Sequence, residues 1–548
     1  MSYKTIEPTP SADSYQLLIK NLLGPAQIYA PEREIVYRGD VRYTYTDLKR
    51  RVGRLANMLT TLGVAPGDTV GVMDWDSHRY LECYFAVPMM GAVLHTINVR
   101  LSPEQMIYTV LHAEDDIILV NAEFLPLLEA VDDKLKAVKK IIVMTDQDPV
   151  PESAITIHGE YESLMSKSSD EYAFPDFDEN VIATIFYTTG TTGPPKGVFF
   201  SHRQIVLHTL GMLSTLCAAD PKFTLTSRDV YMPMTPMFHV HAWGIPYLMT
   251  YMGIKQVYPG RYEADRLLQL VESERVTFSH CVPTILHMLL NSPIIDDVEL
   301  AGWKIIIGGS AMSKGLCQAA LDRGINAISG YGMSETCPVL TIASLKSGKD
   351  YRDDKDQVEK RCRTGLPVPM VDLEIFDIEG NPLPHDGLSV GEVVVRSPWL
   401  TQGYYKEPEK SEALWEYGWL HTGDIGYIDK EGYLQITDRL KDVIKTGGEW
   451  VSSLELEDIL SQHKAVLEAA IIGEPDEKWG ERPVALVVLK PEYRDDVSED
   501  DIREHFLTYV KAGKLPGYAV PKKILLVETI AKTSVGKINK RALRQDLP

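Results

Sequence analysis

The segment 187–197 reads YTTGTTGPPKG and places four threonines, three glycines and Lys196 within eleven residues. The apolar run VIATIFY at 181–187 leads into it and predicts a buried strand, because the run is short, β-branched and aromatic. Glycines let the backbone bend so that successive N–H groups face one anion, and the threonine hydroxyls and Lys196 add donors and positive charge. The sequence therefore predicts a strand followed by a loop that binds a polyphosphate.

This loop differs from the common P-loop, which reads Gly-x-x-x-x-Gly-Lys-Ser/Thr and opens a helix at once. Here two prolines precede Lys196, and the strand-like residues VFF at 198–200 follow it. A Thr/Gly-rich surface turn is the alternative interpretation of such a short cluster.

The composition bounds the class of protein. A chain of 548 residues exceeds what one hydrophobic core usually organises, so at least two domains are expected. A net charge of -21 argues against general nucleic-acid binding. Six scattered cysteines without a Cys-x-x-Cys pair are typical of a reduced protein without a metal-site spacing. Without an apolar signal core or a run of about 18 apolar residues, we expect a cytoplasmic protein, with peripheral membrane contact left open.

The charge is unevenly spread along the chain. From Arg439 onward, 18 basic residues stand against 19 acidic ones, so the excess of acid lies in the preceding part. Between Lys511 and Arg544, nine basic residues stand against one acidic residue. A basic terminal segment suits a mobile part that meets an anionic substrate, and a solvated basic face is the alternative.

Strand and helix patterns alternate over the first three hundred residues, which predicts two doubly wound α/β subdomains. Ligands of such folds lie at the carboxyl ends of the strands. The predicted strands are 69–73, 117–120, 141–144, 181–187, 230–232, 255–258, 276–278 and 304–307. The predicted helices include 48–62, one capped by Ser102, one from Arg203, 243–252, 264–273 and one after Pro283.

The character of the sequence changes after Gly365. Short strands at 372–376 and 391–396 predict a small β-barrel-like subdomain. Beyond it we expect a compact α+β module with helices 455–462 and 499–509 and strands 467–472, 484–489 and 524–527. The predicted organisation is a large N-terminal domain, 1–438, followed by a small mobile C-terminal domain, 439–548.

The complete loop 187–197 resembles the phosphate loop of the adenylate-forming superfamily of acyl-CoA synthetases, luciferases and peptide-synthetase adenylation domains. Further segments resemble the other motifs of this superfamily, each once and in family order, and they are 236–244, 308–312, 331–336, 419–424, 438–442, 447–450 and 533–538. The resemblance spans about residues 40–544 and is closest to bacterial-type fatty acyl-CoA synthetases. It implies an enzyme that uses ATP, Mg²⁺ and coenzyme A.

The resemblance implies a nucleotide site built from several segments. In it Tyr331 would stack on the purine, Asp424 would accept both ribose hydroxyls, and Glu335 and Thr188 would hold Mg²⁺ between phosphates. The implied nucleotide-binding residues are Thr188, Thr189, Gly190, Thr191, Thr192, Gly193, Lys196, Gly309, Ser310, Ala311, Gly330, Tyr331, Gly332, Met333, Ser334, Asp424, Ile436, Arg439 and Lys537. Taken singly, each motif has a structural alternative, because Gly-Gly turns, Tyr-Gly pairs and Asx turns are common.

The acyl site is implied by FHVHAW at 238–243, which looks like the fatty-acid-activating branch. In relatives of this branch the histidine borders the acyl pocket and the tryptophan gates an acyl tunnel. The implied acyl-binding residues are His239, Val240, Trp243, Cys281, Val282, Gly308, Gly309 and Met333. A structural hydrogen-bonding role for His239 and a core position for Trp243 are the alternatives from the residues alone.

The C-terminal motifs imply the bond-making lysine. Lys537 would bridge the carboxylate and the α-phosphate, and Lys196, Glu335 and His239 are the other implied catalytic residues. Lys441 would be the hinge of the small domain. The implied CoA-binding residues are Lys445, Gly447, Gly448, Glu449 and Trp450. Ala531 stands where many relatives have proline, which would loosen the lysine loop.

The implied reaction converts a carboxylate and ATP to acyl-AMP and pyrophosphate, and CoA then displaces AMP. A medium- or long-chain fatty acid is the expected substrate, and an alicyclic or aromatic acid or the reverse direction is the alternative. Other readings are an acyl-AMP ligase, an amino-acid adenylation enzyme, or a non-catalytic nucleotide sensor, which would be expected to lack Glu335, Asp424 or Lys537. The expected partners are small molecules only, without nucleic acid, and a homodimer is left open.

Overall fold

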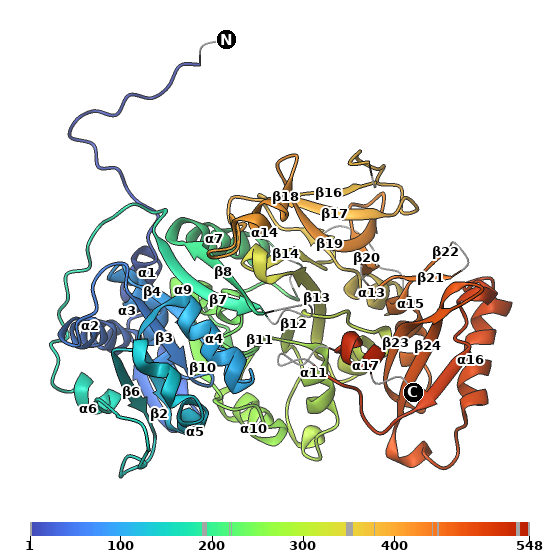
Figure 1. The fold of residues 1–548 in the computed structure, drawn as a ribbon, viewed down its shortest axis with the longest axis horizontal. Coiled ribbons are helices and arrows are strands. Elements are labelled where there is room, and N and C mark those ends of the chain that lie inside the picture. Colours follow the sequence, from blue (N-terminus) through green and yellow to red (C-terminus); the bar gives the residue numbers. More distant parts are fainter. Residues whose placement is uncertain are drawn as a thin grey trace.

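The computed structural model describes residues 3–188, 194–218, 220, 222–346, 354–377, 379–440, 442–446, 449–532 and 538–545. Among these residues the strands form a six-stranded sheet, a nine-stranded sheet and two five-stranded sheets. Figure 1 shows the six-stranded sheet at one end of the molecule and the last sheet, in red, at the other. The predicted fold class, a large α/β domain followed by a small α+β domain, is confirmed.

The six-stranded sheet has the order β6-β5-β3-β4-β7-β8, and all neighbours are parallel except β7 and β8. Its strands are β3 (Thr69–Met73), β4 (Val93–Thr96), β5 (Asp115–Asn121), β6 (Lys140–Met144), β7 (Ile182–Thr188) and β8 (Lys196–Ser201). The accompanying helices are α2 (Tyr45–Thr61), α3 (His78–Met89), α4 (Pro103–Ala113), α5 (Leu125–Glu129), α6 (Tyr161–Met165) and α7 (His202–Cys217). The Ser102 side chain caps α4 and Pro103 opens it, as predicted.

The nine-stranded sheet has the order β15-β14-β13-β12-β11-β9-β10-β1-β2. Its strands are β1 (Glu34–Tyr37), β2 (Val41–Thr44), β9 (Val230–Met234), β10 (Lys255–Tyr258), β11 (Phe278–Cys281), β12 (Lys304–Ile307), β13 (Asn326–Gly332), β14 (Val339–Ile342) and β15 (Leu366–Pro367). Its helices are α1 (Lys20–Tyr29), α8 (Val240–Trp243), α9 (Ile245–Met252), α10 (Ala264–Glu274), α11 (Pro283–Leu290), α12 (Lys314–Leu321) and α13 (Asp354–Arg361).

Two predicted elements of this sheet need correction. The strand predicted at 276–278 occupies 278–281, because the Val276 N–H still bonds to the Val271 carbonyl and so belongs to the end of α10. The helix predicted at 243–252 begins at Ile245. Residues 240–244, which include the short element α8, instead form a left-handed turn with positive φ throughout, from 46° at Ala242 to 72° at Gly244.

The remaining two sheets follow in order. The β subdomain contains β16 (Asp372–Phe376), β17 (Gly391–Arg396), β18 (Trp415–Glu416), β19 (Trp419–Ile428), β20 (Leu434–Arg439) and the helix α14 (Pro408–Glu412). The last module contains β21 (Ile444–Thr446), β22 (Glu449–Val451), β23 (Val466–Asp476), β24 (Gly480–Leu489), β25 (Lys523–Leu526), α15 (Ser453–Ser461), α16 (Glu499–Lys511) and α17 (Lys540–Gln545). The predicted helices and strands of this module are confirmed to within two residues, except that β23 extends to Asp476 and β24 begins at Gly480.

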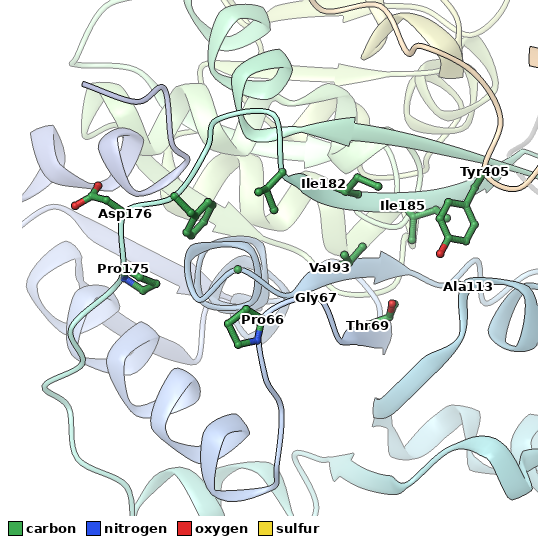
Figure 2. A pocket seen from close by; sticks show the side chains of 13 residues that line it. Pro66, Gly67, Thr69, Val93, Ala113, Pro175, Asp176, Ile182, Ile185 and Tyr405 are labelled. Carbon is green, nitrogen blue, oxygen red and sulfur yellow. The ribbon is translucent and has the colours of Figure 1, made fainter. Parts of the chain in front are cut away.

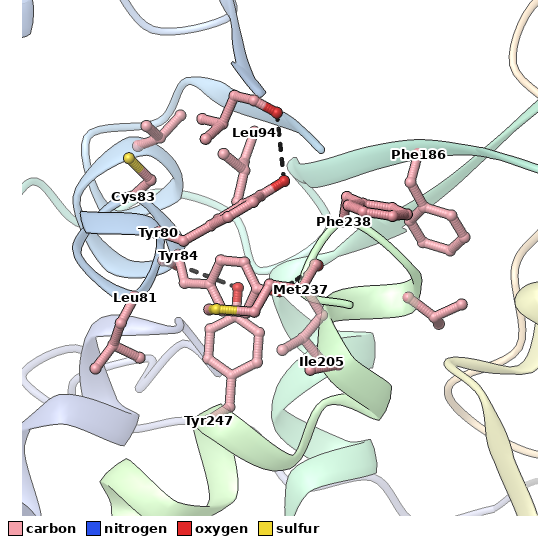
Figure 3. Close-up of a cluster of buried hydrophobic side chains, with 14 of the residues drawn as sticks. Tyr80, Leu81, Cys83, Tyr84, Leu94, Phe186, Ile205, Met237, Phe238 and Tyr247 are labelled. Atoms are coloured by element: carbon pink, nitrogen blue, oxygen red, sulfur yellow. Dashed lines mark hydrogen bonds between the residues drawn. The ribbon is translucent and has the colours of Figure 1, made fainter. Parts of the chain in front are cut away.

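Aromatic side chains fill the space where the first two sheets meet. Figure 3 shows Tyr84 of α3 beside Tyr247 of α9, with ring centroids 5.3 Å apart, and Phe186 of β7 near Phe238. The Tyr84 hydroxyl donates to the Met237 carbonyl. The segment that follows β9 is therefore held from the side of the six-stranded sheet.

The small module contacts the large part through α15 and α12. The Lys314 N–H at the start of α12 donates to Asp458 Oδ1 over 3.2 Å, and Lys314 Nζ lies 3.8 Å from Asp458 Oδ2. A Cβ at Gly315 would lie 3.0 Å from the Ser461 carbonyl oxygen, so the two helices are in close contact. None of the helices in the described residues is long and apolar enough to cross a membrane.

Candidate active site

Both ends of the predicted phosphate loop are held by the β7–β8 hairpin. Thr188, the last residue of β7, pairs directly with Lys196, the first residue of β8, while residues 189–193 lie outside the described residues. The Tyr187 hydroxyl is 2.8 Å from His112 Nδ1. A Cβ at Gly197 would lie 3.2 Å from the Tyr187 ring, so the glycine lets this ring support the far end of the loop. The hairpin thus presents the loop at the carboxyl end of β7.

Lys196 and Glu335 both contact Tyr404, one at the ring and the other at the hydroxyl. Lys196 Nζ lies 4.3 Å from the centre of the Tyr404 ring, and the Tyr404 hydroxyl donates to Glu335 Oε1 over 2.8 Å. Burial and the Glu335 charge raise the pKa of Tyr404, so the phenol remains a donor. The Tyr405 N–H donates to the Gly197 carbonyl over 2.8 Å, which ties this segment to the hairpin. A cation and a carboxylate therefore stand beside the root of the loop.

Sequence reasoning missed Tyr404. Its only local signal is a pair of tyrosines after Gly403, and tyrosine pairs are too common to indicate chemistry. The contact with Glu335 joins residues 69 positions apart and becomes visible only in the fold.

Asp424, Tyr331 and Arg439 form a second polar cluster. The Tyr331 hydroxyl donates to Asp424 Oδ2 over 2.7 Å, and Arg439 Nε lies 3.1 Å from Asp424 Oδ1. The Asp424 charge raises the pKa of Arg439. Ile436 lies on the same strand as Arg439, and its N–H donates to Thr364 Oγ1 over 2.8 Å. Because each carboxylate oxygen has two lone pairs, Asp424 can still accept from a diol.

The glycine motifs lie at the ends of neighbouring strands. β12 and β13 are paired up to Ile307 and Ser329, so Gly309, Ser310 and Ala311 follow one strand beside Gly330 of the other. A Cβ at Gly332 would lie 1.7 Å from the Pro338 carbonyl oxygen, so no larger residue fits there. The Met333 N–H donates to Thr336 Oγ1 over 3.0 Å in the short 3₁₀ turn Ser334–Thr336.

The predicted acyl residues gather around Trp243. The Trp243 ring lies 4.9 Å from the His280 ring. A Cβ at Gly308 would lie 2.8 Å from the Trp243 ring. The Gly308 N–H donates to the Cys281 carbonyl over 3.1 Å, and Val282 follows, half-buried. Burial raises the pKa of the Cys281 thiol, which suits a wall residue rather than a nucleophile.

His239 and His241 have different surroundings. His239 is half-buried directly before the left-handed turn, while Val240 is buried in the main core. The His241 ring is enclosed by Tyr84, Phe186 and Tyr247, and burial lowers its pKa to about 3. His241 therefore belongs to the core.

The motif residues of the small module are only partly described. Lys441, Gly447, Gly448 and Lys537 lie outside the described residues. Lys445 of β21 is exposed, and its N–H donates to Glu481 Oε2 over 2.9 Å, while Glu449 and Trp450 pair with β21 through their backbone. Glu468 and Lys532, joined by an ion pair of 3.1 Å, both act electrostatically on His287 of α11. Lys532, the last described residue before Lys537, therefore lies within electrostatic range of α11.

The donors present suit magnesium bound with a polyphosphate. Mg²⁺ in such sites takes one or two protein oxygens and several phosphate oxygens. Glu335 uses one lone pair for Tyr404 and retains others, and Thr188 adds a hydroxyl at the loop. Within the described ranges, no three or more His, Cys, Asp or Glu side chains form a metal cluster of their own.

A cavity of about 570 Å³ lies elsewhere, at the amino ends of β3 and β4 (Figure 2). Its lining includes Gly67, Thr69, Gly91, Val93 and Ile182. The phosphate loop follows the carboxyl end of β7, so this cavity is separate from the candidate site.

The family to which the chain belongs is shown by comparison with family models. The family model described as AMP-binding enzyme matches residues 26–405. The model described as AMP-binding enzyme C-terminal domain matches residues 455–537. The chain belongs to the AMP-binding enzyme family. By class it is an acyl-CoA synthetase, a ligase that joins an acid to the thiol of CoA, as predicted.

The relatives have different acids in their names. A long-chain-fatty-acid–CoA ligase of Thermus thermophilus is 41% identical, covering 94% of this chain and 92% of its own. A 3-methylmercaptopropionyl-CoA ligase of Ruegeria lacuscaerulensis is 37% identical, covering 97% of each. The structure of the anthranilate CoA ligase AuaEII in complex with anthranoyl-AMP has a TM-score of 0.84 at 25% identity, covering 97% of each chain.

Proposed function

We propose that this protein activates a medium- or long-chain fatty acid as its CoA thioester. ATP and the carboxylate would give acyl-AMP and pyrophosphate, and CoA would then displace AMP. The observation that supports this most strongly is the Lys196–Tyr404–Glu335 arrangement at the root of the phosphate loop, together with Asp424 and its partners. Neither step requires an enzyme nucleophile, so charge neutralisation and alignment are the chemical requirements.

The proposed roles follow from the geometry and the charges. Lys196 and the threonines at 188, 189, 191 and 192 would bind the β- and γ-phosphates, and Asp424 would accept the ribose hydroxyls. Glu335 and Thr188 would hold Mg²⁺, which when bound neutralises phosphate charge. Tyr331 would stack on adenine, with the backbone of 309–311 and 330–334 along its edge. Lys537 would bridge the carboxylate and the α-phosphate, and His239 would border the reacting carboxylate.

The proposed small domain is 439–548, with Lys441 as its hinge. The strand β20 ends at Arg439, two residues before Lys441, which agrees with a hinge directly after this strand. Lys532, five residues before Lys537, pairs with Glu468 within electrostatic range of α11, and on this ground we assign the arrangement to the adenylating step. Rotation about Lys441 would then bring Lys445 and residues 447–450 to the acyl-AMP for the second step.

The acyl group is the least constrained part of the proposal. A fatty chain is supported by Trp243 with its apolar neighbours and by the name of the Thermus relative. A compact aromatic acid is the second candidate, because the Trp243 ring closes on Gly308 and the AuaEII structure holds anthranoyl-AMP. We also propose a cytoplasmic enzyme that uses ATP with Mg²⁺, and its reaction can run in either direction.

A carboxylate panel with ATP, Mg²⁺ and CoA tests the proposal by measuring AMP and acyl-CoA. Fatty acids of medium or long chain should give both products with the highest kcat/KM. AMP without a thioester would favour an acyl-AMP ligase, and an amino acid as best substrate would favour an adenylation enzyme. No AMP with any acid would favour a nucleotide sensor.

Half-reactions test the roles of the two domains. Lys537→Ala should abolish carboxylate-dependent pyrophosphate release and slow thioester formation from supplied acyl-AMP much less. Lys441→Pro should do the reverse, because it blocks the rotation but not the starting arrangement. Equal losses in both half-reactions for either variant would contradict its assigned role.

A further inference from the structure

The segment 237–239, which carries His239, is held at three backbone points by the other sheet. The Met237 N–H donates to Asp76 Oδ1 over 2.8 Å, and the Met237 carbonyl accepts from the Tyr84 hydroxyl (Figure 3). The Phe238 carbonyl accepts from Thr96 Oγ1 over 2.9 Å. The six-stranded subdomain therefore determines where the segment after β9 lies.

Asp76 connects three strand ends. It stands three residues after β3, and its Oδ2 accepts from the Tyr262 hydroxyl in the segment after β10. Its backbone carbonyl accepts from the Gly260 N–H over 2.9 Å. With Met237 after β9, one aspartate thus joins the carboxyl ends of strands from both sheets.

The left-handed turn next to this segment needs such support. Val240, His241, Ala242 and Trp243 have φ between 46° and 59°, a region that L-residues with a Cβ avoid. Such conformations are strained and persist only where the surroundings fix them. If the preceding segment moved, His239 and Trp243 would move with it.

Burying a carboxyl group is also costly unless its hydrogen bonds are specific. Asp76 is only 2% exposed, and an apolar side chain at this position would avoid the free-energy cost of removing a carboxyl group from water. The two carboxyl oxygens of Asp76 each accept one hydrogen bond, from Met237 N–H and from Tyr262 O–H, and these bonds offset the cost of burial.

We propose that Asp76 is a positioning residue of the acyl site, which holds Met237 so that His239 and Trp243 keep their places beside the reacting carboxylate. This inference rests on the proposed function of His239 and Trp243. It assigns no contact between Asp76 and the substrate.

The protonation of Asp76 decides which substitution is conservative. Burial raises its pKa to about 8. The charged and titratable groups that act on it, or on which it acts, are Arg100, Asp74, Tyr80, Tyr84, Tyr231, Tyr258 and Tyr262. The raised pKa favours the neutral acid, and asparagine keeps a carbonyl acceptor for the Met237 N–H while placing an N–H donor where Oδ2 was, from which the Tyr262 hydroxyl can accept.

The chain provides a matched control two residues away. Asp74 is 1% exposed and also follows β3, but it accepts from Ser77 Oγ and from Asn121 Nδ2, and these partners lie within its own subdomain. Asp74→Asn therefore reports the general effect of altering a buried acid in this loop.

The experiment measures the KM of ATP and of the best carboxylate, and kcat, for the full-length enzyme and its variants. Asp76→Ala should lower kcat/KM for the carboxylate by about 10–100-fold, since a displacement of about 1 Å can cost 100-fold, and leave the KM of ATP within about twofold. Asp76→Asn should restore the carboxylate kcat/KM to within about threefold of the wild type. Asp74→Asn should change the melting temperature without an acid-specific loss.

Thr96→Val provides a second variant where Asp76→Ala fails to fold, because it removes the donor to Phe238 and nearly keeps the side-chain shape. The same acid-specific loss is expected. Three results would overturn the role of Asp76 without affecting the proposed function. They are an equal loss of kcat/KM for ATP and for the carboxylate, a carboxylate-specific loss in Asp74→Asn, and no recovery of kcat/KM in Asp76→Asn. A wild type that forms no adenylate with any acid would overturn the proposed function as well.

Discussion

Tyr404 is the residue that connects the proposed phosphate and metal ligands. Tyr404→Phe keeps the ring against Lys196 and removes the hydrogen bond to Glu335. A hydrogen bond to a charged group contributes about 1.5–3 kcal/mol, so we expect the Mg²⁺ concentration for half-maximal adenylation to rise by about tenfold. Tyr404→Leu also removes the cation–π contact and should weaken ATP binding measured by calorimetry in EDTA.

Tyr405→Phe is the matched control for Tyr404. The Tyr405 ring faces His112 and Phe199 rather than Lys196 and Glu335. An equal rise in the Mg²⁺ requirement for Tyr405→Phe would show that the effect is not specific to Tyr404.

Buried histidines predict acid sensitivity. Burial lowers the pKa of His202, His208, His241 and His280 to about 3. Between pH 6.5 and 3 the unfolded chain therefore binds protons that the folded chain does not, and folding stability falls as the pH falls. Each ring contributes up to about 1.4 kcal/mol per pH unit. His208→Leu should make the melting temperature less dependent on pH between 6.5 and 5, with a constant offset between 7 and 8. An unchanged dependence would contradict the burial of this ring.

At the scale of elements, sequence periodicity predicted eight strands of the first two sheets, but neither the left-handed turn nor the strands β1, β2, β4, β14 and β15. Buried parallel strands are continuous apolar runs, so β3, β5, β6 and β12 were predicted within three residues. The turn at 240–244 is apolar as well and was predicted in part as the start of a helix. The segment directly before it, 237–238, is hydrogen-bonded to Asp76, Tyr84 and Thr96, which are more than 140 positions away, and no local pattern shows such contacts.

The β13 strand end depends on a glycine for space. Gly332→Ala would place a Cβ 1.7 Å from the Pro338 carbonyl oxygen, and backbone must shift to admit it. We expect a loss of several kcal/mol in stability, seen as a lower melting temperature, and a weaker ATP affinity by calorimetry. Gly24→Ala, in the open part of α1, has nothing within 4 Å and should be neutral or slightly stabilising. An unaltered melting temperature in Gly332→Ala would contradict this packing.

For the whole molecule, the contact between α12 and α15 holds the small module in the observed arrangement. Asp458 accepts from the first N–H of α12, and such caps contribute about 0.5–2 kcal/mol. Asp458→Ala should therefore slow carboxylate-dependent pyrophosphate release by about 2–10-fold without slowing thioester formation from supplied acyl-AMP. The two half-reactions measure this split.

Asp500→Ala is the control for the interdomain contact. Asp500 is an exposed acid of α16 whose ion-pair partner, Arg503, belongs to the same helix. Equal slowing of both half-reactions by Asp458→Ala, or the same split in Asp500→Ala, would contradict a role for Asp458 in holding the arrangement.

The organisation of the whole chain could be predicted because its motifs occur once and in order. The placement of the small module could not, because it depends on single contacts such as Lys314 with Asp458 across 144 positions. The residues proposed for the chemistry of the small module, Lys441 and Lys537, remain predictions from the sequence.

The pairing of Asp424 with Arg439 has a mechanical consequence. Arg439 is both the partner of the proposed ribose ligand and the last residue of β20, so the chain leaves the β subdomain directly beside the proposed nucleotide site. A ligand bound to Asp424 would therefore act directly on Arg439, the residue from which the linker starts. Release of AMP would then coincide with release of the proposed hinge at Lys441, and the small domain could return to its starting position for the next molecule of ATP.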